Sequence, residues 1–156
     1  MRITDLLKKE SIDLNGVVTT KKETIEKMTL LMEKGGNVKD LEKYRAGVFA
    51  REEEGTTGIG EGIAIPHAKT DAVSGPGLAA MIIRDGVDYD SLDGEPVHMV
   101  FLIAAPNTED NIHLEVLSRL SMLLMDDNFR ANLMKASTVE EFLGYIDQAE
   151  KEKFEE

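Results

Sequence analysis

His67 is the side chain in this sequence best placed for chemistry at neutral pH. It ends a short extended segment, 63–67, directly after the glycine-rich segment 55–62. Polar groups held beside a loop by a strand are where binding and catalytic sites concentrate. An imidazole with a pKa of about 6.5 is mostly neutral at pH 7, so one ring nitrogen keeps a lone pair and can act as a nucleophile. The alternative is a partly exposed surface histidine without a chemical role.

His113 is the second candidate because it falls in the first turn of a leucine-rich helix. It shares a face with Leu117, Leu120 and Leu124, so its side chain is expected to point inward. Helix N-termini present free N–H groups and a partial positive charge, which suit an anion. His113 could therefore donate a hydrogen bond to a phosphoryl oxygen. A core histidine bonded to a carbonyl group explains the pattern equally well.

Arg51 precedes the glycine-rich segment, and Thr56 and Thr57 lie within it. A guanidinium offers a planar fork of donors that matches phosphate oxygens. At about 4 Å and an effective dielectric constant of about 20, the attraction between a guanidinium and one negative charge of a phosphate is about 4 kcal/mol before desolvation. Taken alone, Arg51 is better explained as a cation at a helix C-terminus or as a partner of the acidic triplet 52–54. Either threonine hydroxyl could contact the same anion.

Several other kinds of site are disfavoured. The glycines at 58, 60 and 62 lack the spacing of a dinucleotide-binding motif, and the P-loop sequence is absent. His98 enters an apolar strand and is interpreted as structural. No two histidines share an element at ligand spacing, which argues against a zinc site, and the chain has no cysteine. A hydrolase using the histidines lacks a well-placed acid partner.

Alternating helices and strands are expected to position these residues. Thr20 and Glu23 have the spacing of a capping box that starts a helix, and Gly35-Gly36 ends it. The apolar run 97–105 is typical of a strand covered on both faces. The other expected elements are a helix at 38–51, a strand at 78–83, turns at 85–86 and 93–94, and helices from 110 or 111, over 129–135 and from 138. This order predicts a single α/β domain with a mixed β-sheet sandwiched between helices.

Composition limits the class of protein. The 156 residues suffice for one domain, 1–156, and the net charge of -12 argues against binding to nucleic acid. The sequence shows no apolar run of membrane-spanning length and no signal-peptide layout at residues 1–5, so a cytoplasmic protein is expected. The highly charged segment 148–156 is interpreted as a solvated helix end or the start of a linker.

The segment 51–71, REEEGTTGIGEGIAIPHAKTD, closely resembles the signature around the phosphorylated histidine of the phosphotransferase system (PTS) IIA type 2 family. The resemblance continues through Phe101-Leu102-Ile103-Ala104-Ala105-Pro106 and the helix start at 113–118, and covers most of the chain. The loop and histidine segment most resemble the fructose branch. The family fold, a mixed β-sheet sandwiched by helices, agrees with the pattern of elements.

The resemblance implies a phosphocarrier whose His67 takes a phosphoryl group from the small protein HPr, through its Nε2 nitrogen. It assigns supporting roles to Arg51, His113 and Thr57, with Thr56 still open for the hydroxyl. The phosphoryl group would pass to a IIB domain with a cysteine nucleophile, and thereby serve a membrane IIC component. It implies no nucleotide, metal or other cofactor, and no direct insertion into a membrane.

Two alternatives remain beside sugar transport. In a nitrogen-regulatory protein, phosphorylation of His67 would control binding to other proteins. A binding module that keeps only the fold is disfavoured because His67, Arg51 and His113 occur together. A further hypothesis is that acidic residues flanking the loop attract a basic partner surface. These residues are Glu52, Glu53, Glu54, Glu61 and Asp71.

Overall fold

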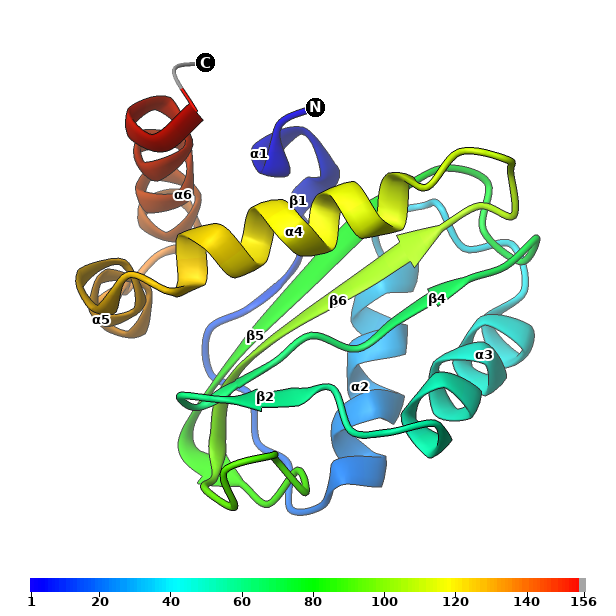
Figure 1. The fold of residues 1–156 in the computed structure, drawn as a ribbon, viewed down its shortest axis with the longest axis horizontal. Coiled ribbons are helices and arrows are strands. Elements are labelled where there is room, and N and C mark those ends of the chain that lie inside the picture. The colour runs from blue at the N-terminus through cyan, green and yellow to red at the C-terminus, as the bar shows by residue number, and fades with distance from the viewer. Residues whose placement is uncertain (155–156) are drawn as a thin grey trace.

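The computed structural model describes residues 1–154, which form a six-stranded mixed sheet with helices on both faces (Figure 1). Within this range no helix is both long and apolar enough to span a lipid bilayer. The helices are α1 (Ile3–Leu6), α2 (Lys21–Glu33), α3 (Leu41–Glu53), α4 (Ile112–Leu124), α5 (Asp127–Lys135) and α6 (Val139–Phe154). The strands are β1 (Leu7–Asp13), β2 (Gly58–Gly60), β3 (Ile63–Ala64), β4 (His67–Lys69), β5 (Gly77–Val87) and β6 (Val97–Ala105).

Strand β6 is the centre of the sheet. It pairs antiparallel with β5, and both β3 and β4 run parallel to it along its other edge. Strand β1 pairs parallel with β5, and β2 pairs antiparallel with β3. The sheet is therefore mixed, as the sequence predicts. The pairing of β4 with β6 places His67 opposite Ile103.

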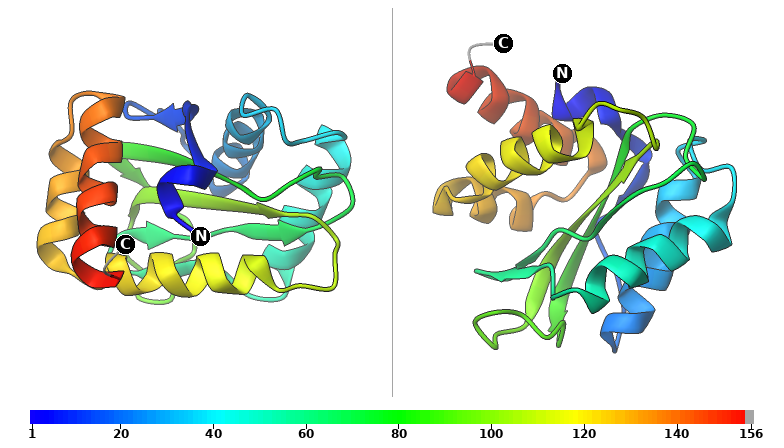
Figure 2. Two further views of the ribbon diagram at one scale, coloured as in Figure 1. Left: turned by 90° about the horizontal axis from the view of Figure 1, so that it is seen from above. Right: turned by 45° about the vertical axis from the view of Figure 1, so that its right-hand side comes forward.

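Two cores lie on opposite faces of the sheet. Side chains of β6 alternate between them: Phe101 and Ile103 belong to one core, and Leu102 and Ala104 to the other. Helices α4, α5 and α6 pack on the first face, and α2 and α3 on the second (Figure 2, right). This confirms the predicted strand at 97–105, covered on both faces, and the sandwich of sheet and helices.

The helix starts follow their capping residues. The Thr20 hydroxyl accepts a hydrogen bond from the Glu23 N–H at 3.0 Å, as the capping box predicts, although the Glu23 carboxylate returns to the N–H of Thr19. The helix predicted from residue 38 begins instead at Leu41, capped by Asp40. Val38 pairs with Val73 in an isolated β-bridge, and the backbone of Asp40 is extended, so the helix does not begin at residue 38.

Other sequence predictions need correction. The segment 55–62, expected to be a loop, contains strand β2. The turn expected at 85–86 lies inside β5, where the pairing with β6 shifts register and Gly86 has a φ of +76°. A glycine bulge therefore replaces a chain reversal, because only glycine adopts this conformation without a steric penalty. Helix α1 and strand β1 were not anticipated.

The segment interpreted as a charged tail, 148–156, is part of helix α6 as far as Phe154, and residues 155–156 lie outside the described range. Glu150 in this segment is fully buried, so it is not solvated as predicted. Its carboxylate accepts a hydrogen bond from the Ile3 N–H at 2.8 Å and pairs with Arg119 at 3.1 Å. The first and last described segments therefore lie side by side (Figure 2).

Candidate active site

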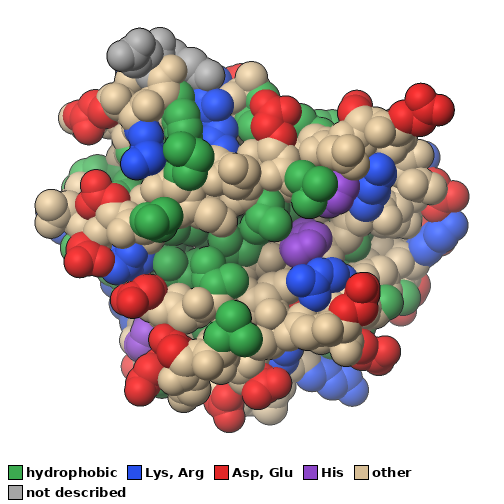
Figure 3. Space-filling model, viewed as in Figure 1, with side chains coloured by type: hydrophobic (Ala, Val, Ile, Leu, Met, Phe, Trp, Pro, Cys, Tyr) green, Lys and Arg blue, Asp and Glu red, His purple; other side chains and the backbone are tan. Residues whose placement is uncertain are grey.

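A cavity of about 490 Å³ opens between the C-terminal part of α3, strand β4 and the start of α4. Figure 3 shows two neighbouring histidine side chains on this side of the molecule, with basic side chains beside them. The structure thus brings together Arg51, His67 and His113 from three separate elements. The lining residues are Gly47, Ala50, Arg51, Glu54, His67, Ala68, Lys69, His113 and Leu114.

His67 is held in one tautomer by the backbone. Its Nδ1 lies 3.0 Å from the carbonyl oxygen of Ile65. A carbonyl oxygen can only accept a hydrogen bond, so Nδ1 carries a proton, and in the neutral ring Nε2 keeps its lone pair. Pro66 directs its own carbonyl to the N–H of Ile103 at 3.0 Å, which fixes the start of β4 on the sheet. In its neutral form the half-buried ring therefore offers Nε2 as a possible nucleophile.

His113 lies in the first turn of α4 and is half-buried. Within the described residues, its Nδ1 is shielded from solvent and has no hydrogen-bond partner. The interpretation as a core histidine satisfied by a carbonyl therefore lacks support at this nitrogen. Burial lowers the pKa of His113, and the positive charge of Lys69 lowers it further. At pH 7 the ring is neutral and offers one N–H donor.

Arg51 lies in the last turn of α3, and its Nη1 donates to the carbonyl oxygen of Gly55 at 2.8 Å. Among the described residues, it forms no ion pair with the acidic triplet that follows it. Its remaining N–H groups are therefore not committed to a carboxylate. This leaves the guanidinium able to bind an anion in the cavity.

Lys69 was not singled out from the sequence, yet it lines the same cavity. Residues two apart in a strand share a face, so β4 presents His67 and Lys69 together. The Lys69 ammonium donates to the carbonyl oxygen of Asp110 at 3.1 Å, which ties β4 to the segment before α4. Its position two residues after His67 was a signal, but the extended segment was predicted to end at residue 67.

Thr57 is not among the residues that line the cavity. It is buried, its hydroxyl donates to a carboxylate oxygen of Glu52, and the hydroxyl of Tyr89 lies 3.3 Å away. Thr56 is also not among the lining residues; its hydroxyl accepts the Gly58 N–H and donates to the Tyr89 carbonyl. The structure therefore does not bring either hydroxyl into the site. It also corrects the view of Glu52 as a surface acid, since that residue is buried.

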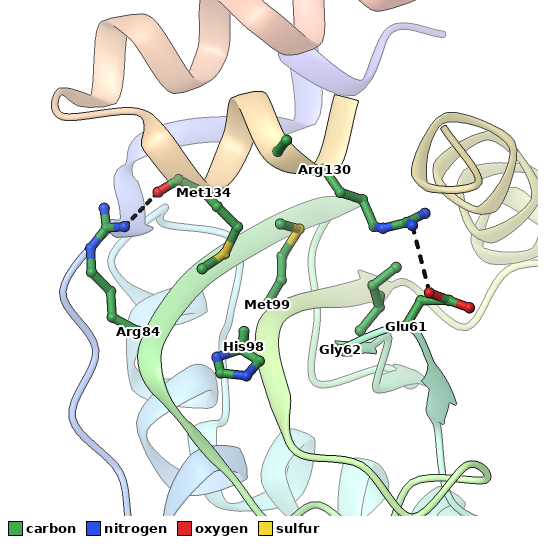
Figure 4. A pocket seen from close by; sticks show the side chains of 9 residues that line it. Glu61, Gly62, Arg84, His98, Met99, Arg130 and Met134 are labelled. Carbon is green, nitrogen blue, oxygen red and sulfur yellow. Dashed lines mark hydrogen bonds and ion pairs between the residues drawn. The ribbon is translucent and has the colours of Figure 1, made fainter. Parts of the chain in front are cut away.

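His98 lies in a different cavity, of about 330 Å³, which shares no lining residue with the first (Figure 4). Its Nδ1 donates to the carbonyl oxygen of Ile83 at 3.1 Å, in keeping with the structural role expected of it. Arg84 donates to the Met134 carbonyl, and Arg130 lies 3.7 Å from Glu61 (Figure 4). Among residues 1–154, no cluster of three histidine or carboxylate side chains is placed to hold a metal ion.

The chemistry of the first cavity is that of an anion site around a nucleophile. Arg51 and Lys69 bring positive charge to a chain whose net charge is -12, and His113 adds a neutral donor. Such groups stabilise the negative charge that develops on the oxygens of a transferring phosphoryl group. In the neutral ring of His67, Nε2 has the lone pair that a nucleophile needs without a general base.

Comparisons with known proteins show the family of the chain. A family described as "Phosphoenolpyruvate-dependent sugar phosphotransferase system, EIIA 2" matches residues 5–149. The fructose-specific EIIABC component of Bacillus subtilis is 46% identical over 151 residues, which are 97% of this chain and 24% of that protein. This chain therefore spans about a quarter of the length of that relative.

Solved structures share the fold. The nitrogen regulatory protein IIA-Ntr from Neisseria meningitidis superposes with a TM-score of 0.85 at 33% identity, over 92% of this chain and 98% of that one. The Escherichia coli mannitol IIA enzyme, in complex with phosphorylated IIB, has a TM-score of 0.79 at 28% identity, over 92% and 99%. With the match at residues 5–149, these findings show that the chain belongs to the EIIA 2 family of the phosphoenolpyruvate-dependent sugar phosphotransferase system.

Proposed function

We propose that this chain is a phosphocarrier that accepts a phosphoryl group on Nε2 of His67 from phosphorylated HPr and passes it to a IIB domain. The observation that carries the proposal is the hydrogen bond from Nδ1 of His67 to the Ile65 carbonyl, at 3.0 Å, within a basic cavity. It leaves the lone pair of Nε2 available for attack on phosphorus. The identity of 46% with a fructose-specific component supports fructose or a fructose-like sugar.

The transfer step exchanges one N–P bond for another. The lone pair of His67 Nε2 forms a bond to phosphorus while the bond to the donor's histidine nitrogen breaks, and that electron pair stays on the donor nitrogen. Arg51 and His113 stabilise the charge on the phosphoryl oxygens, and Lys69 adds to the field. Positioning of the two proteins provides the rest of the catalysis.

The onward partner is proposed from the relatives. The mannitol IIA enzyme of Escherichia coli forms a complex with phosphorylated IIB. We infer that this chain delivers its phosphoryl group to a IIB cysteine, and through it to a sugar carried by a membrane IIC component. We also propose that the domain is cytoplasmic, as expected from its sequence. Thr57 is proposed to act through the loop rather than by contact with the phosphoryl group, because its hydroxyl is buried.

The experiment is phosphoryl transfer from phosphoenolpyruvate through enzyme I and HPr, read by intact mass and acid lability. Wild type is expected to gain one acid-labile phosphoryl group, and His67→Ala none. His98→Ala is the matched control, since that histidine lies in a separate cavity, and it should still accept the group. Folded wild type that gains no phosphoryl group from a competent donor would refute the proposal.

A regulatory role is the second candidate, favoured by the TM-score of 0.85 with a nitrogen regulatory protein. In that role phosphorylation of His67 would change the affinity of the protein for another protein. Transfer from the phosphorylated chain to a fructose-type IIB domain distinguishes the transport role from the regulatory role. Rapid transfer supports sugar transport, whereas a stable phosphohistidine in the presence of IIB supports regulation.

A further inference from the structure

A continuous series of hydrogen bonds runs from a buried carboxylate to the ring of His67. The Glu52 carboxylate accepts the N–H of Thr57 at 3.1 Å, and the Thr57 carbonyl accepts the N–H of Ile65 at 3.0 Å. The Ile65 carbonyl then accepts Nδ1–H of His67 at 3.0 Å. The position of the acceptor that sets the His67 tautomer therefore depends, through two residues, on Glu52.

Glu52 is an unusual residue for this role because acidic side chains are seldom buried without partners. Its side chain is 5% exposed, and the ammonium of Lys21 lies 2.9 Å from Oε1. The Thr57 hydroxyl donates to the other oxygen, Oε2. The hydroxyl hydrogen of Thr57 is thus committed, so the nearby Tyr89 hydroxyl donates to Thr57. Every group of this cluster has a partner.

The cluster joins elements that are distant in the sequence. Lys21 begins α2, Glu52 lies in the last turn of α3, and Thr57 precedes β2. The Lys21 ammonium also lies 4.7 Å above the ring of Tyr89. Burial raises the pKa of Tyr89, and the negative charge of Glu52 raises it further, so its hydroxyl stays protonated.

Glu52 also adjoins Arg51 in the chain. The same turn of α3 therefore carries two functional groups. The guanidinium of Arg51 lines the cavity, and the carboxylate of Glu52 binds Thr57, which in turn binds Ile65 before His67. Fixing Glu52 in the interior fixes the separation of these two groups. Misplacement of reacting groups by about 1 Å can cost roughly 100-fold in rate.

We propose that Glu52, clamped by Lys21 and Thr57, is a positioning residue that sets the tautomer of His67 and its alignment with Arg51. This inference rests on the proposed phosphocarrier function for its kinetic part. The tautomer of His67 is a property of the unphosphorylated protein and can be measured independently. Glu52 does not touch the phosphoryl group; it acts through Thr57 and Ile65.

The experiment compares Glu52→Gln with Glu53→Gln. Both remove one negative charge, but Glu53 is exposed, whereas the carboxylate that binds Thr57 is that of Glu52. A neutral amide has one acceptor oxygen in place of two charged ones, so the hold on Thr57 and Lys21 weakens. Nitrogen-15 NMR of the His67 ring should show a loss of the Nδ1–H tautomer in Glu52→Gln and wild-type populations in Glu53→Gln.

Phosphoryl transfer at saturating donor is the second readout. Glu52→Gln should transfer roughly 10- to 100-fold more slowly than wild type, with little change in the half-saturating donor concentration. Glu53→Gln should keep the wild-type rate at saturation. A folded Glu52→Gln protein with the wild-type tautomer and the wild-type rate would overturn the proposal.

Thr57 gives a test that does not depend on the stability of the Glu52 variant. Thr57→Val removes the hydroxyl bond to Glu52, whereas Thr57→Ser keeps it. The valine variant should lose the Nδ1–H tautomer of His67, and the serine variant should keep it. Equal tautomer populations in both would contradict the proposal. If wild type accepts no phosphoryl group while these NMR results hold, the phosphocarrier function fails and the positioning role stands.

Discussion

At the scale of single residues, the chemistry of the candidate site depends on which nitrogen of His67 carries a proton. The sequence predicted His67, His113 and Arg51 as candidates, and the structure places all three around one cavity. The sequence did not predict that Lys69 lines this cavity, nor that Thr57 and Glu52 are buried. A linear pattern places a residue in an element, whereas the direction of a loop side chain is set by distant partners such as Tyr89.

The role of Arg51 depends on the shape of the guanidinium as well as on its charge. Arg51→Lys keeps the charge but replaces a planar fork of donors with a single ammonium. We expect the rate of phosphoryl transfer to fall roughly tenfold, a loss of about 1.4 kcal/mol of transition-state stabilisation. Rapid-quench measurement of the single-turnover rate would check this. An unchanged rate would show that Arg51 acts only as a charge.

The pKa of His113 should respond to the state of His67. Burial lowers this pKa below its usual value of 6.5, and the positive charge of Lys69 lowers it further, so His113 is neutral at pH 7. A phosphoryl group on His67 favours the imidazolium, so phosphorylation should raise the pKa. NMR titration of the two states would measure the shift, and a pKa that falls on phosphorylation would contradict the geometry.

The lowered pKa of His113 also predicts how the stability of the fold changes with pH. Below pH 6.5 the unfolded chain binds a proton at His113 more readily than the folded chain does. The free energy of unfolding should therefore decrease on acidification from pH 7 through the unfolded pKa. In His113→Asn this contribution disappears, so urea midpoints at pH 7.5 and 5.5 should differ less than in wild type.

At the scale of elements, helices and strands with strong local sequence signals were predicted correctly, and those with weak signals were not. The apolar run 97–105 gives β6 with the bounds expected, because alternate side chains fill the two cores. Strand β1 was missed because it is a sheet edge with three successive exposed residues, 8–10, and its identity comes from pairing with β5. Gly86 gave a turn signal, yet its neighbours continue the strand.

The N-cap of α2 provides a test at this scale. Thr20→Ala removes the acceptor of the Glu23 N–H and should lower the free energy of unfolding by about 1 kcal/mol. Thr19→Ala is the control, since the Thr19 hydroxyl makes only an exposed contact with Glu23 at 3.3 Å. Urea denaturation would measure both. Equal losses in the two variants would show that the cap does not stabilise the helix start.

At the scale of the whole molecule, an acidic protein has a cavity that is lined by Arg51 and Lys69 as well as by Glu54. The charge of -12 did not predict this cavity, because net charge says nothing about where cations gather. The charged segment at 148–156 was misjudged for a similar reason. A run of charges normally indicates a solvated face, but Glu150 is fully buried against the start of the chain.

Glu150 links the first residues of the chain to helices α4 and α6. Glu150→Ala would leave the Ile3 N–H and the Arg119 guanidinium without this partner, and should cost about 3–5 kcal/mol of stability. Glu152→Ala, at an exposed position on the same helix, should change stability by about 0.5 kcal/mol or less. Thermal unfolding would compare them, and similar melting temperatures would refute the link.

The central claim is tested most directly by locating the phosphorus atom. The protein, labelled with nitrogen-15, is phosphorylated through enzyme I and HPr, and the histidine rings are examined by NMR for coupling to phosphorus-31. We predict coupling at Nε2 of His67, with Nδ1 still protonated by its bond to the Ile65 carbonyl. Phosphorus on Nδ1, on another residue, or on no residue of a folded protein with a competent donor would contradict the account.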